Sequence, residues 1–204
     1  SPTAQVFAAL QDLSVIVQTG QPLQIADALA AALCSPLFTG KAWQLNFKKL
    51  IAMVETNRPM FTVIAKTGNS KLGHMAAFST LPGVTCPGAG DCLSHCYSFT
   101  AHRYPAAYAR QFQNAYLMRF NFRAIADDFA TLKHAVDFRL YVDGDYSSAK
   151  DVEQWQDLLA TRQDVKAYGY SKSFALLVDH NASGKAWASN YLLNISGGHN
   201  ASAY

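Results

Sequence analysis

Apolar residues recur at helical spacing through the first third of the chain. Between Val6 and Val17 they fall every three or four positions, which predicts a helix that ends at Gly20. The same spacing predicts two further helices, over residues 22–33 and 42–55. Residues 1–58 are therefore expected to form a helical cap in which no chemistry is evident.

Strand-like segments begin near residue 60. Residues 61–65 are rich in β-branched and aromatic side chains, and residues 74–79 form a second strand candidate. A long helix is predicted from Pro105 to about residue 129, with aromatic residues four positions apart at Tyr108, Phe112, Tyr116 and Phe120. An aromatic stripe at that spacing is more typical of core packing than of a platform that stacks bases.

Strands and helices alternate from residue 138 onward. Strands are predicted over residues 138–142, 165–170 and 191–195, with a helix after Ser148 and a helical stretch from Phe174. The strand starts repeat about every 26 residues, the length of a βα unit, and right-handed crossovers would make the strands parallel. We expect an α/β fold, either an incomplete α/β barrel or an open parallel sheet, with the N-terminal helical cap beside it.

The composition supports one compact domain. The chain has 204 residues, of which 50% are apolar and 15% charged, so disorder is excluded. We expect residues 1–204 to form a single domain, with the cysteine loop and the βα units in residues 60–200. The formal net charge of +3 is too small to imply an anionic partner.

Several classes of protein are disfavoured by what the sequence lacks. The most apolar stretch, residues 23–38, is interrupted by Asp27 and Pro36 and is too short to span a bilayer, so we expect a soluble, cytoplasmic protein without a membrane partner. The phosphate-binding loop, the dinucleotide-binding glycine motif, the hydrolase nucleophile elbow and the signatures of zinc proteases and zinc deaminases are absent.

Three of the four cysteines lie within eleven residues. Cys86, Cys92 and Cys96 form the pattern C-x5-C-x3-C, and glycine and proline in the first gap let the backbone turn tightly. Clustered thiolates select an iron–sulfur cluster or zinc, so these three cysteines are predicted metal ligands. The alternative is three reduced thiols that pack as small apolar groups. The fourth ligand is left open among Cys34, His95, His102 and no residue.

Polar side chains follow each of the three predicted strands. In parallel α/β sheets reactive groups collect at the carboxyl ends of the strands, so we expect these side chains to face one mouth. The candidate catalytic residues, which would orient the substrate or move protons, are Asp143, Asp145 and Lys172. The candidate substrate-binding residues there are Ser171, Ser173, Asn194 and Ser196. The alternative is that the aspartates only form a turn and a helix cap, with Lys172 extended into solvent.

Arginines on or beside the aromatic helix are candidates for nucleic-acid binding. Arg103 and Arg110 follow the cysteine loop directly, and Arg119 and Arg123 lie further along. The alternative for all four is a solvated helix face.

Several of these segments together resemble the phage "gene product 88" domain family. They are GNSKLG at residues 68–73, FSTLPG at 78–83, TCPGA at 85–89, Cys92, Cys96–Tyr97, RLYVDGD at 139–145 and YGYSKS at 168–173. The resemblance covers roughly residues 60–200 and implies a protein of phages, plasmids or other mobile elements. It also adds Asn69 and Lys71 of the first segment to the candidate substrate-binding residues.

The chain is also distantly similar to radical SAM proteins, in which three loop cysteines hold a four-iron cluster. That superfamily uses C-x3-C-x2-C with an aromatic residue before the last cysteine, whereas the gaps here are five and three and Tyr97 follows. This difference argues against S-adenosylmethionine as a cofactor.

Two classes of function remain open. The preferred one is a mobile-element protein with a cysteine-ligated metal centre beside the polar strand ends. We expect an iron–sulfur cluster ahead of zinc in this centre. If the protein is catalytic, it would then be an iron–sulfur enzyme. The alternative is a non-catalytic regulator in which zinc staples the loop and the arginines bind nucleic acid or a host protein. The substrate and the oligomeric state are not specified by the sequence.

Overall fold

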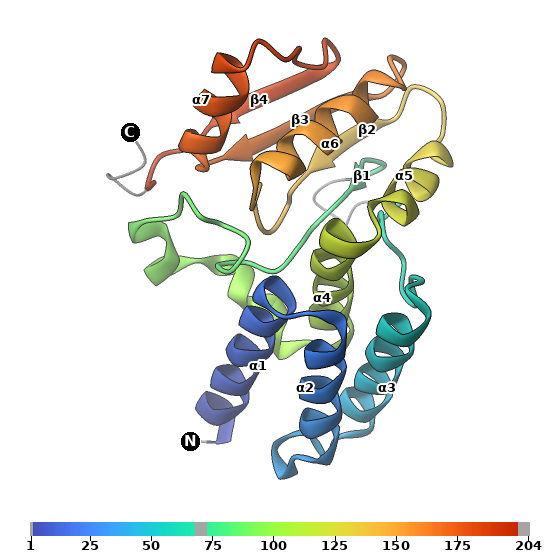
Figure 1. Ribbon diagram of the computed structural model, residues 1–204, viewed down its shortest axis with the longest axis vertical. Coiled ribbons are helices and arrows are strands. Elements are labelled where there is room, and N and C mark those ends of the chain that lie inside the picture. The colour runs from blue at the N-terminus through green and yellow to red at the C-terminus, as the bar shows by residue number, and fades with distance from the viewer. Residues whose placement is uncertain (1, 68–72, 200–204) are drawn as a thin grey trace.

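The computed structural model describes residues 2–67 and 73–199 (Figure 1). The first third of the chain is helical, as expected, and Figure 1 shows it at one end of the molecule with the sheet at the other. Its elements are α1 (Pro2–Thr19), α2 (Pro22–Cys34), the short 3-10 helix η1 (Pro36–Phe38) and α3 (Lys41–Thr56). Across the described residues, no helix combines the length and the apolar character needed to cross a membrane.

The long aromatic helix is broken in two. α4 (Pro105–Phe120) and α5 (Phe122–Ala130) meet at Asn121, whose φ of −153° is not helical. The side chain of Asn121 accepts a hydrogen bond from the Ala124 N–H at 3.3 Å, so this residue caps the second helix. The prediction of one continuous helix was wrong, because aromatic periodicity continues across a cap without marking it. Tyr108, Phe112 and Tyr116 of α4 are buried and Phe120 is partly buried against the same core, which confirms their role in core packing.

The sheet is parallel and open, which confirms the predicted fold class. Its order is β1-β2-β3-β4, and every neighbouring pair is parallel. The strands are β1 (Ala76–Ala77), β2 (Asp137–Leu140), β3 (Lys166–Ser171) and β4 (Tyr191–Ile195). α6 (Ala149–Ala160) connects β2 to β3, and α7 (Phe174–Ala182) connects β3 to β4. The sheet does not close into a barrel within the described residues.

The strand predicted over residues 61–65 was wrong. Its only sheet-like contact among the described residues is an isolated bridge between Ala65 and Ala77. Side chains of α4 take the place of a neighbouring strand: Gln113 accepts hydrogen bonds from the Met60 and Phe61 N–H groups at 2.6 and 2.8 Å. The segment is therefore buried through contacts that its own composition does not reveal.

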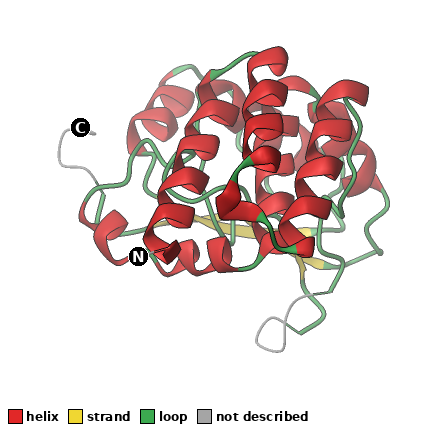
Figure 2. Ribbon diagram, turned by 90° about the horizontal axis from the view of Figure 1, so that it is seen from below, coloured by secondary structure: helices red, strands yellow, loops and turns green. Residues whose placement is uncertain are grey.

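The two faces of the sheet differ in how they are covered. Phe138 points toward the helices and its ring centroid lies 5.4 Å from that of Phe129 and 5.9 Å from that of Trp155. Arg139 and Tyr168, which are paired in register on β2 and β3, point to the opposite face. Figure 2 shows most of the helices on one side of the strands. Residues 2–67 and 73–199 leave the second face largely uncovered.

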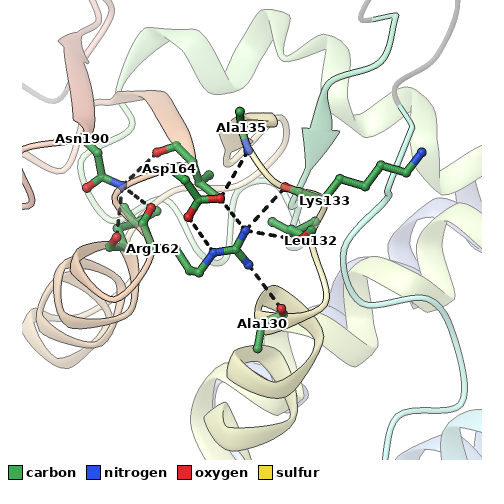
Figure 3. Close-up of polar contacts among 9 residues, drawn as sticks. Ala130, Leu132, Lys133, Ala135, Arg162, Asp164 and Asn190 are labelled. Atoms are coloured by element: carbon green, nitrogen blue, oxygen red, sulfur yellow. Dashed lines mark hydrogen bonds and ion pairs between the residues drawn. The ribbon is translucent and has the colours of Figure 1, made fainter.

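Arg162 fixes the turn between α5 and β2 at the amino edge of the sheet (Figure 3). Its guanidinium pairs with Asp164 at 2.7 Å and donates to the carbonyl oxygens of Ala130, Leu132 and Lys133. Asn190 donates to three further carbonyl oxygens nearby, those of Leu159, Arg162 and Val165. These contacts satisfy carbonyl groups that no strand partner reaches, so the strands start from a fixed position.

Candidate functional site

A cavity of about 440 Å³ lies at the carboxyl ends of the strands. One wall is the loop that carries the three cysteines, and the other is formed by residues that end β2, β3 and β4. Cys86, Asp143, Asp145, Lys172 and Ser196 all line it. The expected gathering of polar groups at one mouth therefore includes the three candidate catalytic residues. The volume is in the range typical of small-molecule sites.

The cysteine loop is anchored directly on the sheet. The Gly88 backbone lies against Lys172, and Ala89 forms an antiparallel bridge with His199. The Gly90 N–H also donates to the Gly198 carbonyl oxygen at 3.2 Å. The wall of the cavity is thus held by backbone contacts to both β3 and the segment after β4.

The cysteines line the cavity but do not form a metal site. Among the residues that the structure describes, no group of three or more His, Cys, Asp or Glu side chains is arranged to hold a metal ion. The predicted iron–sulfur or zinc centre at Cys86, Cys92 and Cys96 was therefore wrong. All three are free cysteines.

Local geometry and burial bear on this outcome. Cys92 lies in the 3-10 helix η2 (Asp91–His95), and Cys96 is its C-cap with an extended backbone (ψ 109°). Helical periodicity therefore stops before Cys96 and does not bring the two thiols onto one helix face. Burial, with a further contribution from Asp145, raises the pKa of the Cys86 thiol to about 12. A metal ligand is a thiolate, so in the metal-free protein this thiol carries a proton that a metal would have to displace.

Asp145 joins the loop after β2 to the end of β3. Its side chain is 5% exposed and accepts hydrogen bonds from the Tyr146 N–H, the Ser171 hydroxyl and the Lys172 N–H, at 2.7–2.8 Å. Burial nevertheless raises the pKa of this carboxyl, and the same hydrogen bonds oppose the rise. Both carboxylate oxygens are occupied, so Asp145 positions the strand ends.

Asp143 is more available to a bound molecule than Asp145 is. Its Oδ2 accepts a hydrogen bond from the Gln111 amide at 2.9 Å. Burial raises the pKa of the Asp143 carboxyl, while hydrogen bonds from Ser98 and Gln111 and the charges of Arg110 and Arg139 lower it. The side chain is only partly buried and lines the cavity. It is therefore a carboxyl group with a raised pKa that a bound molecule can reach.

Two cations face the same cavity. Lys172 donates from Nζ to the Ser196 hydroxyl at 2.9 Å, and its backbone, not its ammonium, contacts Asp145. The Arg139 guanidinium lies 5.7 Å from the centroid of the Tyr170 ring. Arg139 Nε is buried without a hydrogen-bond partner. Among the described residues, neither cation has a carboxylate within 4.0 Å. The ion pairs found among these residues are formed by Lys66, Arg123, Arg162 and Lys185.

A protein-family model for gene product 88 matches residues 49–204. The chain belongs to the gene product 88 family. No curated protein and no solved structure matches the chain. The match covers the second half of α3, the later described helices, the four strands and the whole cavity, and leaves α1, α2 and η1 outside.

This gene product 88 protein also places strained backbone at the cavity. Tyr141, directly after β2, has a φ of +54°, a conformation that costs a non-glycine residue on the order of 1 kcal/mol. Its ring is 4% exposed, and its hydroxyl accepts a hydrogen bond from the Trp155 indole at 3.2 Å. The strained turn directs Asp143 toward the cavity. Sequence reasoning missed Tyr141, Arg139 and Gln111 as site residues, although two of them fall within the RLYVDGD segment.

The candidate substrate-binding residues are distributed unevenly. Ser196 lines the cavity, whereas Ser171 and Ser173 are buried and donate to Asp145 and to the Tyr146 carbonyl oxygen. Asn194 donates to the Gly169 carbonyl oxygen at 3.1 Å. Asn69 and Lys71 lie outside the described residues.

Most of the arginines proposed for nucleic acid have partners inside the protein. Arg110 lies close enough to Asp143 to favour its charged form. Arg119 donates to the Val17 and Gly20 carbonyl oxygens at 2.6 and 2.8 Å, and Arg123 pairs with Asp127 at 2.6 Å. Arg103 is exposed at the end of the 3-10 helix η3 (Tyr97–Arg103).

Proposed function

We propose that the cavity binds a small anionic molecule and that Asp143 exchanges a proton with it. The observation that carries the proposal is the pair Arg139 and Lys172, two cations that face one cavity and have no carboxylate within 4.0 Å among the described residues. A guanidinium with an unpartnered, buried Nε has capacity for a further acceptor. Phosphate and carboxylate groups are the acceptors that arginine and lysine bind best.

Asp143 is the group suited to proton transfer. A general acid or base works best when its pKa approaches the working pH, and burial moves the pKa of this carboxyl upward from its ordinary value. The charges of Arg110 and Arg139 oppose this rise because they stabilise the charged form. Asp145 is unsuited to the same role because its oxygens already accept three hydrogen bonds.

Family membership supports the expectation that the protein acts in a phage, a plasmid or another mobile element, the setting that the resemblance implies. It names no substrate, so the ligand is described by its chemistry alone. Tyr97 and Tyr170 lie at the rim of the cavity and are 70% and 48% exposed. Their rings offer flat apolar surface to the organic part of a ligand that carries the anionic group.

Calorimetric titration tests the binding step. Inorganic phosphate, a nucleoside monophosphate and a small aromatic carboxylate are titrated into the wild type and into Arg139→Ala and Lys172→Ala. We expect each change to weaken binding of a recognised anion about ten- to a hundredfold, because each removes a charge-assisted contact.

The matched controls are Arg123→Ala and Lys150→Ala, which remove exposed cations of the same kind away from the cavity. They should leave the affinity unchanged. Equal losses in controls and cavity variants would show that only overall charge matters, and absence of binding by every probe would contradict the proposal.

The role of Asp143 is tested by the pH dependence of the same titration. A negative carboxylate opposes an incoming anion, so affinity should rise as pH falls and Asp143 gains a proton. His95 also lines the cavity. Asp143→Asn should bind more tightly at neutral pH and lose part of the pH dependence. Asp91→Asn, at an exposed position of η2, is the control.

A further inference from the structure

The uncovered face of the sheet is unusual for parallel strands. Parallel sheets are normally buried on both faces, because crossover helices cover them. Here the face opposite the helices carries Tyr168, Tyr170 and Leu192. Tyr170 is 48% exposed and Leu192 is 65% exposed. This second face therefore presents aromatic and apolar surface to solvent.

The exposed side chains form one row with a cation in it. Arg139, Tyr168 and Leu192 are register neighbours on β2, β3 and β4. Tyr168 and Tyr170 have ring centroids 6.3 Å apart, and the Arg139 guanidinium lies 5.7 Å from the Tyr170 ring centroid. Rings and a guanidinium together are suited to a partner that is both flat and anionic.

The row continues into the cavity. Arg139 and Tyr170 belong to the exposed face and also line the cavity, and Lys172, directly after the end of β3, lines the cavity as well. At about 3.3 Å per residue, Tyr168 lies about 10 Å from Ser171, where β3 ends beside Lys172. A ligand longer than one nucleotide can therefore contact the cavity and the face at once.

We propose that the exposed face binds single-stranded nucleic acid, with its terminal phosphate in the cavity and its adjoining bases stacked on Tyr170, Tyr168 and Leu192. The inference rests on the proposed function for the phosphate end. Bases of a single strand have free π-faces, and stacking on aromatic side chains beside cations is how such strands are bound. Duplex DNA is excluded from this mode because its bases already stack on one another.

Fluorescence anisotropy with labelled oligonucleotides tests the length of the site. We compare a nucleoside monophosphate with 5′-phosphorylated single strands of up to about six nucleotides. The affinity should rise about tenfold or more once the strand reaches the face, since each stacked base contributes about that factor. Two phosphate contacts predict that log K falls by about 1.4 per decade of salt, and duplex DNA should bind more weakly.

Charge substitutions at Leu192 show what occupies the face. Leu192 is exposed, so Leu192→Asp and Leu192→Lys should both fold, and the aspartate should weaken strand binding while the lysine strengthens it. The matched controls are Leu23→Asp and Leu23→Lys at an exposed position of α2. A second pair compares Tyr168→Ala with Tyr104→Ala, which removes an exposed tyrosine elsewhere.

The two proposals fail in different ways. Equal affinity for the monophosphate and the longer strands, or no effect of the Leu192 charges, overturns the stacking face and leaves the cavity proposal standing. Absence of monophosphate binding with unchanged strand binding in Lys172→Ala overturns the cavity proposal instead. A change of oligomeric state in Leu192→Asp, seen by gel filtration without any strand binding, would show that a second copy covers the face and would overturn the nucleic-acid proposal.

Discussion

The backbone of Gly88 lies directly against that of Lys172, because a β-carbon at Gly88 would come 1.8 Å from the Lys172 carbonyl oxygen. This contact joins the middle of the cysteine loop to the end of β3. The same β3 segment supplies the Lys172 ammonium to the cavity. The position of one cavity wall therefore depends on the absence of a single side chain.

Gly88→Ala should displace the cysteine loop. An added β-carbon meets backbone atoms of Lys172 and Ser173 within 2.7 Å, and backbone cannot rotate away as a side chain can. We expect a loss of stability on the order of 1–3 kcal/mol, typical of overpacking, and a weaker affinity for any cavity ligand. Chemical denaturation and ligand titration measure the two effects.

Gly197→Ala is the matched control for that change. Nothing lies within 4 Å of a β-carbon at Gly197, and its φ is not in the left-handed region. This variant should behave as the wild type. Equal effects at Gly88 and Gly197 would contradict the close contact.

Asp145 should make stability depend on acid conditions in a definite direction. Burial raises the folded-state pKa of this carboxyl above its ordinary value of 3.8. The unfolded chain therefore ionises first as pH rises, and the folded state loses relative stability from about pH 3.8 up through the folded pKa. Urea denaturation over a range of pH should show that the free energy of unfolding of Asp145→Asn increases relative to that of the wild type as pH rises. Asp157→Asn, at an exposed position, is the matched control.

His102 should make the folded state less stable as pH falls, which is the opposite of the effect of Asp145. Its ring is 2% exposed, both nitrogens lack a hydrogen-bond partner, and burial lowers its pKa from 6.5 to about 4. The unfolded chain takes up the proton first as pH falls, so stability is lost between pH 6.5 and about 4, by on the order of 3 kcal/mol. His102→Phe should remove this loss and be slightly more stable at pH 7. A fall with pH as steep as that of the wild type would contradict the assignment, and exposed His134→Phe is the control.

Arg119 and Arg123 should contribute very different amounts to the free energy of unfolding, although both were candidates for an arginine face. Arg119 donates to carbonyl oxygens at the end of α1, so Arg119→Ala should cost about 1–3 kcal/mol. Arg123 has an 84% exposed side chain in a surface ion pair, so Arg123→Ala should cost less than about 1 kcal/mol. Thermal denaturation of both variants measures this, and equal losses would contradict the distinction.

The strands could be predicted because each is a local feature. β4 spans residues 191–195 as expected, and β2 and β3 are displaced by one or two residues at their ends. The alternation that predicts a strand requires only its own few residues. The βα spacing also predicted parallel strands, and from them the gathering of Asp143, Asp145 and Lys172 at one edge.

The errors arose where distant residues act on a segment. Residues 61–65 have a strand-like composition, yet Gln113 and Asn114 of α4 bind their backbone groups. The three cysteines are close in sequence, but the helical periodicity of η2 stops before Cys96, and burial raises the pKa of the Cys86 thiol. Neither spacing nor composition contains that information.

By itself, the sequence determined a parallel α/β fold, the helical first third and the polar strand ends, because periodicity and chain connectivity are sufficient for these features. Only the tertiary structure decided that the sheet is open within the described residues and that these residues leave one of its faces uncovered. It also decided that Asp145 is satisfied by backbone and hydroxyl groups, and that Arg139 and Lys172 share a cavity without a carboxylate within 4.0 Å among the described residues. These properties depend on contacts between residues that are distant in sequence. Such contacts determine hydrogen bonding and burial, and the order of residues along the chain does not show them directly.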